Sequence, residues 1–60
     1  MEKYYLSFIF NYENEQIKIE EIKNNIYEKF PKAKITDIEI KKVEHGLFNV
    51  ESEVKILFVI

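Results

Sequence analysis

Hydrophobic residues recur along this chain with two different periods, and the change of period divides it into structural elements. Between residues 3 and 12, apolar and aromatic side chains occupy every second position. One side of the segment would carry Tyr4, Leu6, Phe8, Phe10 and Tyr12. This alternation, with many aromatic and β-branched residues, predicts a β-strand over residues 3–12.

A helical period follows this first strand. An apolar residue recurs there at spacings of three and four, at Ile19, Ile22, Ile26 and Phe30. This spacing predicts one stripe of an amphipathic helix. We expect a loop over residues 13–16, Glu20 and Glu21 in the first helical turn, and Lys29 in the last, as the helix dipole favours. Pro31 should end the helix, because the residue before a proline disfavours helical geometry.

Two further alternating segments follow Pro31. Residues 34–43 predict a second strand, with Ile38 and Ile40 on its apolar side. His45 and Gly46 mark a turn, since glycine tolerates positive φ. Residues 47–60 predict a long and strongly apolar third strand. The even-numbered side of this strand carries Phe48, Val50, Ser52, Val54, Ile56, Phe58 and Ile60.

The order strand, helix, strand, strand predicts an α+β fold in one domain over residues 1–60. A crossover helix makes the first two strands run the same way, and the tight turn makes the third run against the second. The third strand is the most apolar, as a central strand should be, and a central position also avoids a less stable parallel pair. We therefore expect a three-stranded antiparallel sheet of order 1-3-2, with one helix packed on its even-numbered face.

The register of the hairpin is restricted by side-chain parity, because a one-residue slip would turn Ile38 and Ile40 outward. The preferred register sets Ile40 against Val54 and Ile38 against Ile56. It also sets Lys41 against Glu53 and Glu39 against Lys55. A shift of two residues keeps the parity and offers Lys41–Glu51 and Asp37–Lys55 instead. Cross-strand charge pairs contribute only about 0.2–1 kcal/mol each, so the charges leave both registers open.

The odd-numbered face of the sheet has no covering element in this scheme. It carries charged residues and also a set of apolar residues. The apolar set is Tyr5, Ile9, Ile35, Leu57 and Val59. A contiguous apolar patch of several hundred Å² usually marks an interface. These residues are therefore the predicted interface, and the free edges of the two outer strands offer a second route to self-association.

Size and composition also favour self-association. A chain of 60 residues buries only about 60% of the surface that it exposes when unfolded. Small folds compensate with disulfides, metals or oligomerisation, and this sequence has no cysteine and a single histidine. We therefore expect a homodimer or a higher homo-oligomer. The net charge of −2 gives no general attraction to nucleic acid. No apolar run approaches the roughly 20 residues that a membrane span needs, so we expect a cytoplasmic protein.

Side chains with catalytic potential are few. His45 lies in the predicted turn without an evident partner, and Ser7 and Ser52 lack a nucleophile-elbow context. Glu13, Glu15, Glu20 and Glu21 cluster around the helix start, but their spacing matches no calcium loop. We therefore predict no catalytic, metal or cofactor-binding residue, no cofactor and no enzymatic activity.

The element order resembles that of the dodecins, small flavin-storing oligomers. The resemblance covers topology alone: dodecins sandwich flavin with a tryptophan on the second strand, whereas this chain has no tryptophan and carries Asp37 near that place. It implies, as an alternative, an oligomer that stores a small ligand between subunits.

The leading hypothesis is a non-enzymatic protein-interaction module, a small inhibitor or adaptor of the kind that mobile elements encode, which self-associates and binds another protein. A third hypothesis is single-stranded nucleic-acid binding through Tyr5 and nearby lysines.

Overall fold

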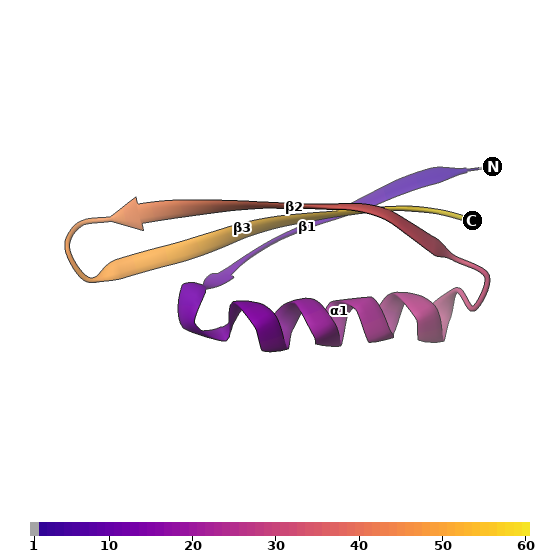
Figure 1. Ribbon diagram of the computed structural model, residues 1–60, viewed down its shortest axis with the longest axis horizontal. Coiled ribbons are helices and arrows are strands. Elements are labelled where there is room, and N and C mark those ends of the chain that lie inside the picture. Colours follow the sequence, from indigo (N-terminus) through magenta and orange to yellow (C-terminus); the bar gives the residue numbers. More distant parts are fainter. Residues whose placement is uncertain (1) are drawn as a thin grey trace.

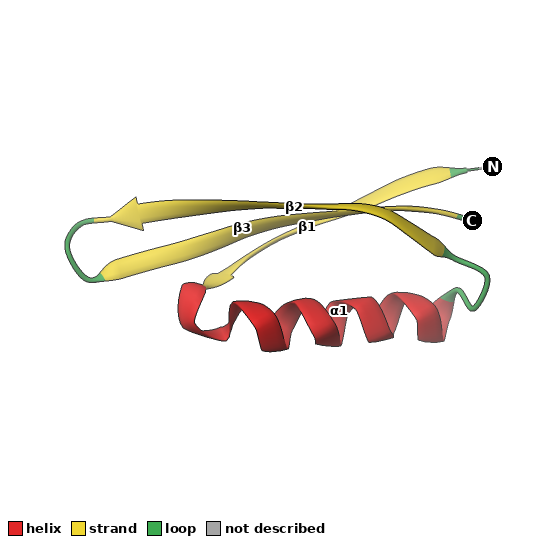
Figure 2. Ribbon diagram, in the orientation of Figure 1, coloured by secondary structure: helices red, strands yellow, loops and turns green. Residues whose placement is uncertain are grey.

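The computed structural model of the protein describes residues 2–60 and contains three strands and two helical segments (Figures 1 and 2). These are β1 (Lys3–Asn11), the 3₁₀ helix η1 (Tyr12–Asn14), α1 (Glu15–Lys29), β2 (Lys34–His45) and β3 (Asn49–Val59). The strands form one sheet of order β1-β3-β2, and both outer strands run antiparallel to β3. The predicted α+β class and strand order are confirmed.

The hairpin of β2 and β3 adopts the preferred register. Ile40 lies opposite Val54 and Ile38 opposite Ile56, while Lys41 faces Glu53 and Glu39 faces Lys55. The alternative register, shifted by two residues, is therefore wrong. Packing of the apolar pairs against the helix side selects the register, because the charged residues of the other face fit either one.

The hairpin turn lies two residues later in the chain than predicted. β2 continues to His45, which pairs with Asn49, and Gly46 occupies the left-handed region with φ 78°. Residues 46–48 therefore connect the strands, and the prediction that the third strand begins at residue 47 is wrong. A three-residue connection preserves the parity that the apolar pairs require, which a two-residue turn would not.

The helix begins earlier than the apolar stripe indicated. The Asn11 side chain accepts a hydrogen bond from the Glu13 N–H at 3.0 Å and caps η1, which leads directly into α1 at Glu15. The prediction of a loop at residues 13–16 is therefore wrong, and Glu15, rather than Glu20 and Glu21, is the acidic residue of the first turn. At the other end, Lys29 lies in the last turn as expected, just before Pro31.

A bulge interrupts β2 near its start. Ile35 lies opposite Phe58 and Asp37 opposite Leu57, so Thr36 has no opposing residue, and its hydroxyl donates to the Leu57 carbonyl at 3.3 Å. The extra residue reverses the alternation. Ile35 is consequently half-buried and packs against the core on the helix side of the sheet. Its predicted place on the open face is wrong.

The core is small and centred on β3. It consists of Ile19 and Ile26 from α1, Ala33, and Val54, Ile56 and Phe58 from β3. Figure 1 shows α1 lying along one side of the sheet. The outer strands are covered less well on that side, since Tyr4 is 43% exposed and Ile40 49%. The expectation that the helix covers all three strands is wrong, because one helix is only about 10 Å wide and three strands span more.

The molecule is long and thin. Its Cα positions extend over 43 × 18 × 11 Å, and the radius of gyration of 12.8 Å exceeds the roughly 10 Å typical of a compact chain of this length. Figure 1 shows the reason: the β2–β3 hairpin projects past the start of α1, and both chain ends lie at the opposite end. The hairpin turn is therefore remote from the core.

Candidate interaction surfaces

The open face of the sheet carries four of the five predicted interface residues. Tyr5 pairs directly with Leu57, and Val59 lies one position further along the same face of β3. Ile9 lies opposite Glu53, so Ser7 and Lys55 separate it from the other three. Tyr5 is 63% and Ile9 62% exposed, whereas Leu57 and Val59 are half-buried. The apolar set thus divides into one cluster at the sheet end and one isolated isoleucine.

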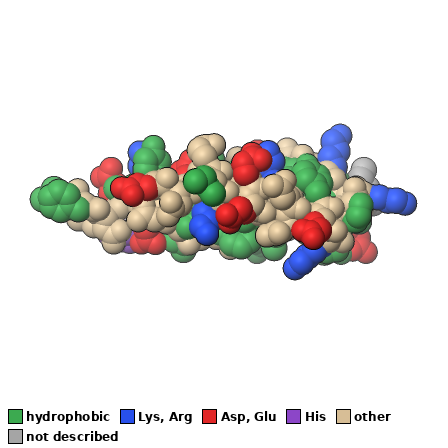
Figure 3. All heavy atoms as spheres, turned by 90° about the horizontal axis from the view of Figure 1, so that it is seen from below, with side chains coloured by type: hydrophobic (Ala, Val, Ile, Leu, Met, Phe, Trp, Pro, Cys, Tyr) green, Lys and Arg blue, Asp and Glu red, His purple; other side chains and the backbone are tan. Residues whose placement is uncertain are grey.

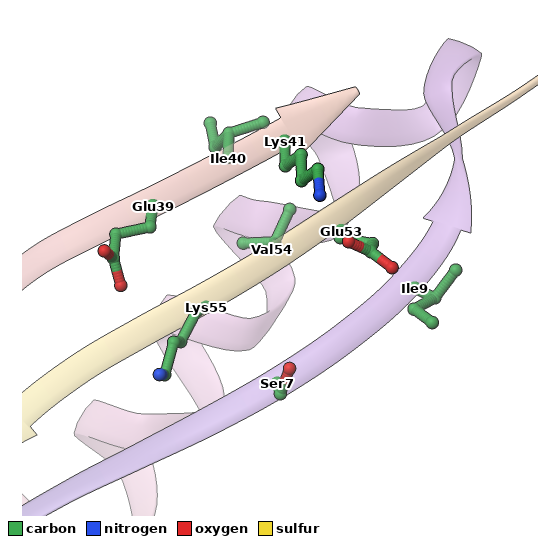
Figure 4. Close-up of a pocket in the computed structure, with 8 residues that line it drawn as sticks. All are labelled: Ser7, Ile9, Glu39, Ile40, Lys41, Glu53, Val54 and Lys55. Carbon is green, nitrogen blue, oxygen red and sulfur yellow. The ribbon is translucent and has the colours of Figure 1, made fainter. Parts of the chain in front are cut away.

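Charged side chains occupy the middle of this face (Figure 4). A shallow hollow of about 440 Å³ is lined there by Ser7, Ile9, Glu39, Ile40, Lys41, Glu53, Val54 and Lys55. Its two lysines lie opposite its two glutamates, so the charges balance across the strands. Lys55 Nζ lies 4.6 Å from the centroid of the Tyr5 ring. That cation–π contact already occupies one side of the ring, which makes Tyr5 a poor platform for stacking a nucleic-acid base.

An apolar groove lies on the other side of the sheet, between β1 and α1. It has a volume of about 440 Å³ and is lined by Leu6, Phe8, Ile22, Asn25, Ile26, Lys29, Phe30 and Phe58. Leu6 and Phe30 are 37% and 42% exposed, because the helix lies over β3 and leaves β1 partly uncovered. Sequence reasoning missed this groove because it assumed complete coverage of the even-numbered face.

Aromatic rings gather beside the groove. Phe58 stacks with Tyr4 at 5.7 Å between centroids and contacts the Phe30 ring at 6.1 Å. The Tyr4 hydroxyl donates a hydrogen bond to the Glu2 carboxylate, and that bond, with desolvation and the negative charge of Glu2, raises the pKa of Tyr4. The apolar end of β1 is thereby held against the C-terminal part of β3.

The hairpin turn presents the most exposed large hydrophobic side chains of the described residues. Leu47 is 91% and Phe48 97% exposed. Figure 3 shows hydrophobic side chains at the narrow end of the molecule, where this turn lies. Just behind it, His45 Nε2 lies 2.9 Å from Glu51 Oε1 and links the two strands. Sequence reasoning placed Leu47 and Phe48 in a strand, so it missed a tip that could have been found from the parity of the turn.

The two outer strands leave edges of different character. Glu2 and Ile60 exchange two main-chain hydrogen bonds, at 3.3 and 3.0 Å, so even-numbered residues of β1 direct their N–H and C=O groups toward β3. The odd-numbered residues, Lys3, Tyr5, Ser7, Ile9 and Asn11, therefore direct theirs to the free edge. This edge contains no proline and no bulge, whereas the β2 edge is bulged at Thr36 and rich in charged side chains.

The remaining candidates for chemistry have structural partners. Ser52 is fully buried, and its hydroxyl donates to Glu15 Oε2 at 2.5 Å, which joins β3 to the first turn of α1. Ser7 is exposed on β1. Within residues 2–60, no three His, Asp or Glu side chains are grouped so that they could hold a metal ion. None of the helices in this described part is both long and apolar enough to cross a membrane.

Comparisons with family models, curated proteins and solved structures find no match to this chain. The surfaces described above are therefore the features that bear on function.

Proposed function

We propose that this protein is a non-enzymatic interaction module, of inhibitor or adaptor type, that self-associates and binds another protein. The observation that carries the proposal is the hairpin tip, where Leu47 and Phe48 are almost fully exposed. Large apolar residues at a turn gain nothing for the fold, since turns favour small polar residues. They are well suited to fill an apolar pocket on a partner, as the central residues of interfaces do.

The hairpin is a good support for such a tip. Its strands remain paired up to His45 and Asn49, and the His45–Glu51 contact lies directly behind the turn. A preorganised element loses little conformational freedom on binding, which favours affinity. The projection of the hairpin beyond α1 keeps the rest of the molecule away from the partner surface (Figure 1).

Affinity capture tests this role. The tagged chain and its double variant Leu47→Ser/Phe48→Ser would be used to capture proteins from cells, with quantitative mass spectrometry as readout. We expect the captured partner to fall by at least about 30-fold for the variant, since truncation of hot-spot residues costs about 2 kcal/mol or more. Ile17→Ser is the matched control, because Ile17 is 64% exposed on α1, away from the tip. Equal capture by the double variant and the wild type would contradict docking through the tip.

Storage of a small apolar ligand is a second candidate, favoured by the groove between β1 and α1. Its volume of about 440 Å³ falls in the range of about 300–1,000 Å³ typical of ligand sites, and most of its lining is apolar. Native mass spectrometry of protein purified without denaturation would reveal a bound small molecule as added mass. Protein of the bare chain mass, alone or in oligomers, would count against storage.

A further inference from the structure

We infer that the free edge of β1 pairs antiparallel with β1 of a second copy, about a two-fold axis at Ser7. This inference rests on the proposed self-association and assigns it to one strand and one register. It joins two three-stranded sheets into one continuous sheet of six strands. The β1 edge, rather than the predicted open face, is thereby the surface between subunits.

The main chain of β1 directs hydrogen-bonding groups outward at the positions that this pairing requires. Its odd-numbered residues direct both polar groups outward, as the Glu2–Ile60 pair establishes. Antiparallel pairing about Ser7 sets odd residues opposite odd residues, so each outward N–H meets an outward C=O of the other copy. Centring on residue 7 also uses the full strand from Lys3 to Asn11, whereas any other centre leaves part of it unpaired.

The side chains of β1 are self-complementary in the same register. Tyr5 lies opposite Ile9 of the second copy on the open face, and Leu6 lies opposite Phe8 on the helix side. The ends bring Lys3 opposite Asn11, so no like charges face each other. Aromatic residues opposite aliphatic ones on adjacent strands stabilise a sheet. This palindrome-like pattern identifies a second copy, rather than a foreign strand, as the occupant.

The two-fold axis stands perpendicular to the sheet, which places both helices on the same side. The apolar grooves of the two copies then face each other across the axis, and the Leu6 and Phe8 side chains of both copies fill the space between them. Exposed apolar surface beside β1 is thus removed from water along with the polar edge. Pairing through β1 therefore satisfies the hydrogen-bonding groups of the edge main chain and also covers the groove.

The area available matches a weak to moderate dimer. Tyr4, Tyr5, Leu6 and Ile9 are 43%, 63%, 37% and 62% exposed. At roughly 200 Å² for each large residue, they offer about 400 Å² per copy. Stable interfaces bury about 800 Å² per partner and weak ones less, so the edge main chain and the groove residues must supply the remainder. We therefore expect a dissociation constant in the micromolar range.

The β2 edge provides the contrast needed for a matched test. By the same alternation, Ile40 directs its N–H away from β3, as Ser7 does. Ser7→Pro removes an outward N–H and costs the monomer no ladder hydrogen bond; Ile40→Pro does the same on the other edge. By size-exclusion chromatography with light scattering, we expect Ser7→Pro to weaken the dimer at least tenfold and Ile40→Pro to leave it unchanged. Circular dichroism checks that both variants fold.

Cysteine trapping tests the register independently. Residues opposite each other in a hydrogen-bonded antiparallel pair have Cα atoms about 5.5 Å apart, within disulfide range. The chain has no cysteine of its own, so Ser7→Cys should form a covalent dimer under mild oxidation, while Ile9→Cys should remain monomeric on a non-reducing gel. Cross-linking at residue 9 instead of 7 would overturn the register.

The outcomes separate this inference from the wider proposal. A wild-type dimer that survives Ser7→Pro and is not trapped by Ser7→Cys would overturn pairing through β1 and leave self-association standing. A strict monomer at high micromolar concentration would overturn both. Partner capture through the hairpin tip is measured separately, so its success or failure leaves the β1 result intact.

Discussion

β1 and β2 both pair antiparallel with the central strand β3, but their outer edges differ in charge and in regularity. β2 is bulged at Thr36 and carries Lys34, Asp37, Glu39, Lys41, Lys42 and Glu44. β1 has one charged residue, at its start, and no bulge. Bulges and charged side chains are the usual means of preventing edge-to-edge association. The difference teaches that this chain is protected against uncontrolled pairing on one side and left available on the other.

The largest effect is expected from a core substitution in β3, the central strand that pairs with both outer strands. Ile56 is fully buried on β3, opposite Leu6 and Ile38. Ile56→Ala should cost about 2–5 kcal/mol by leaving a cavity. A chain of this length has only about 3–9 kcal/mol of stability, so most of it would be lost. Urea unfolding followed by circular dichroism measures the change, and Ile9→Ala, on exposed β1, should lose far less. Equal losses would contradict a core centred on β3.

The two serines provide the next comparison, between a buried strand and a free edge. Ser52→Ala removes the donor that Glu15 accepts from, and should lower the free energy of unfolding by about 1–3 kcal/mol. Ser7→Ala on β1 should change it by less than about 0.5 kcal/mol, as surface substitutions do. Urea midpoints of the two variants test the difference. An unchanged urea midpoint for Ser52→Ala would mean that the Glu15 contact contributes nothing to stability.

A smaller effect is expected when β1 is given a charged side chain of the kind that protects the β2 edge. Ile9→Lys puts a charge on the apolar edge, where it would face Tyr5 of a second copy. Loss of the apolar contact between Ile9 and Tyr5, together with a charge at the edge, should weaken self-association by roughly tenfold, or about 1.4 kcal/mol. Sedimentation equilibrium of wild type and variant measures the shift. Lys41→Arg keeps the charge of the other outer strand and serves as control. An unchanged dissociation constant for Ile9→Lys would show that β1 is not the contact.

The smallest effect concerns the end of β1. The Glu2 carboxylate raises the pKa of Tyr4, so Glu2→Gln should bring that pKa down toward 10. Because the pKa is raised in the folded state, the associated stability is present below about pH 10 and is lost as the pH rises through the raised value. Ultraviolet absorbance during an alkaline titration follows the phenolate directly. A titration unaffected by Glu2→Gln would contradict the contact between these side chains.

The sequence predicts the strand order because the third strand is the most apolar, and it predicts the parity of the register because Ile38, Ile40, Val54 and Ile56 form one apolar side. It fails at Ile35, since a bulge adds one residue and no local feature of Ile35-Thr36-Asp37 announces it. It fails at Leu47 and Phe48, because their alternation continues that of β3 although the chain is turning. The incomplete cover of β1 is a matter of the width of one helix against three strands, which periodicity does not contain.

Of the five predicted interface residues, Tyr5, Ile9, Leu57 and Val59 lie on the open face, and only Tyr5 and Ile9 are strongly exposed. Periodicity identifies the face of a strand on which a residue lies. It does not identify which of the two outer strands has the unprotected edge, because the bulge in β2 appears only in the folded structure.

The meeting of Glu2 and Ile60 in one hydrogen-bonded pair has a consequence for chain connectivity. A short linker between these residues, with the backbone opened within residues 46–48, would give a circular permutant that keeps every strand pair. In the permutant β3 and β1 become neighbours along the chain, so their pairing closes a short loop instead of spanning the helix and β2. Loop-closure entropy then favours that pair early, while the β2–β3 pair becomes the long-range one, so the order in which the two pairs form should reverse while the native structure stays the same.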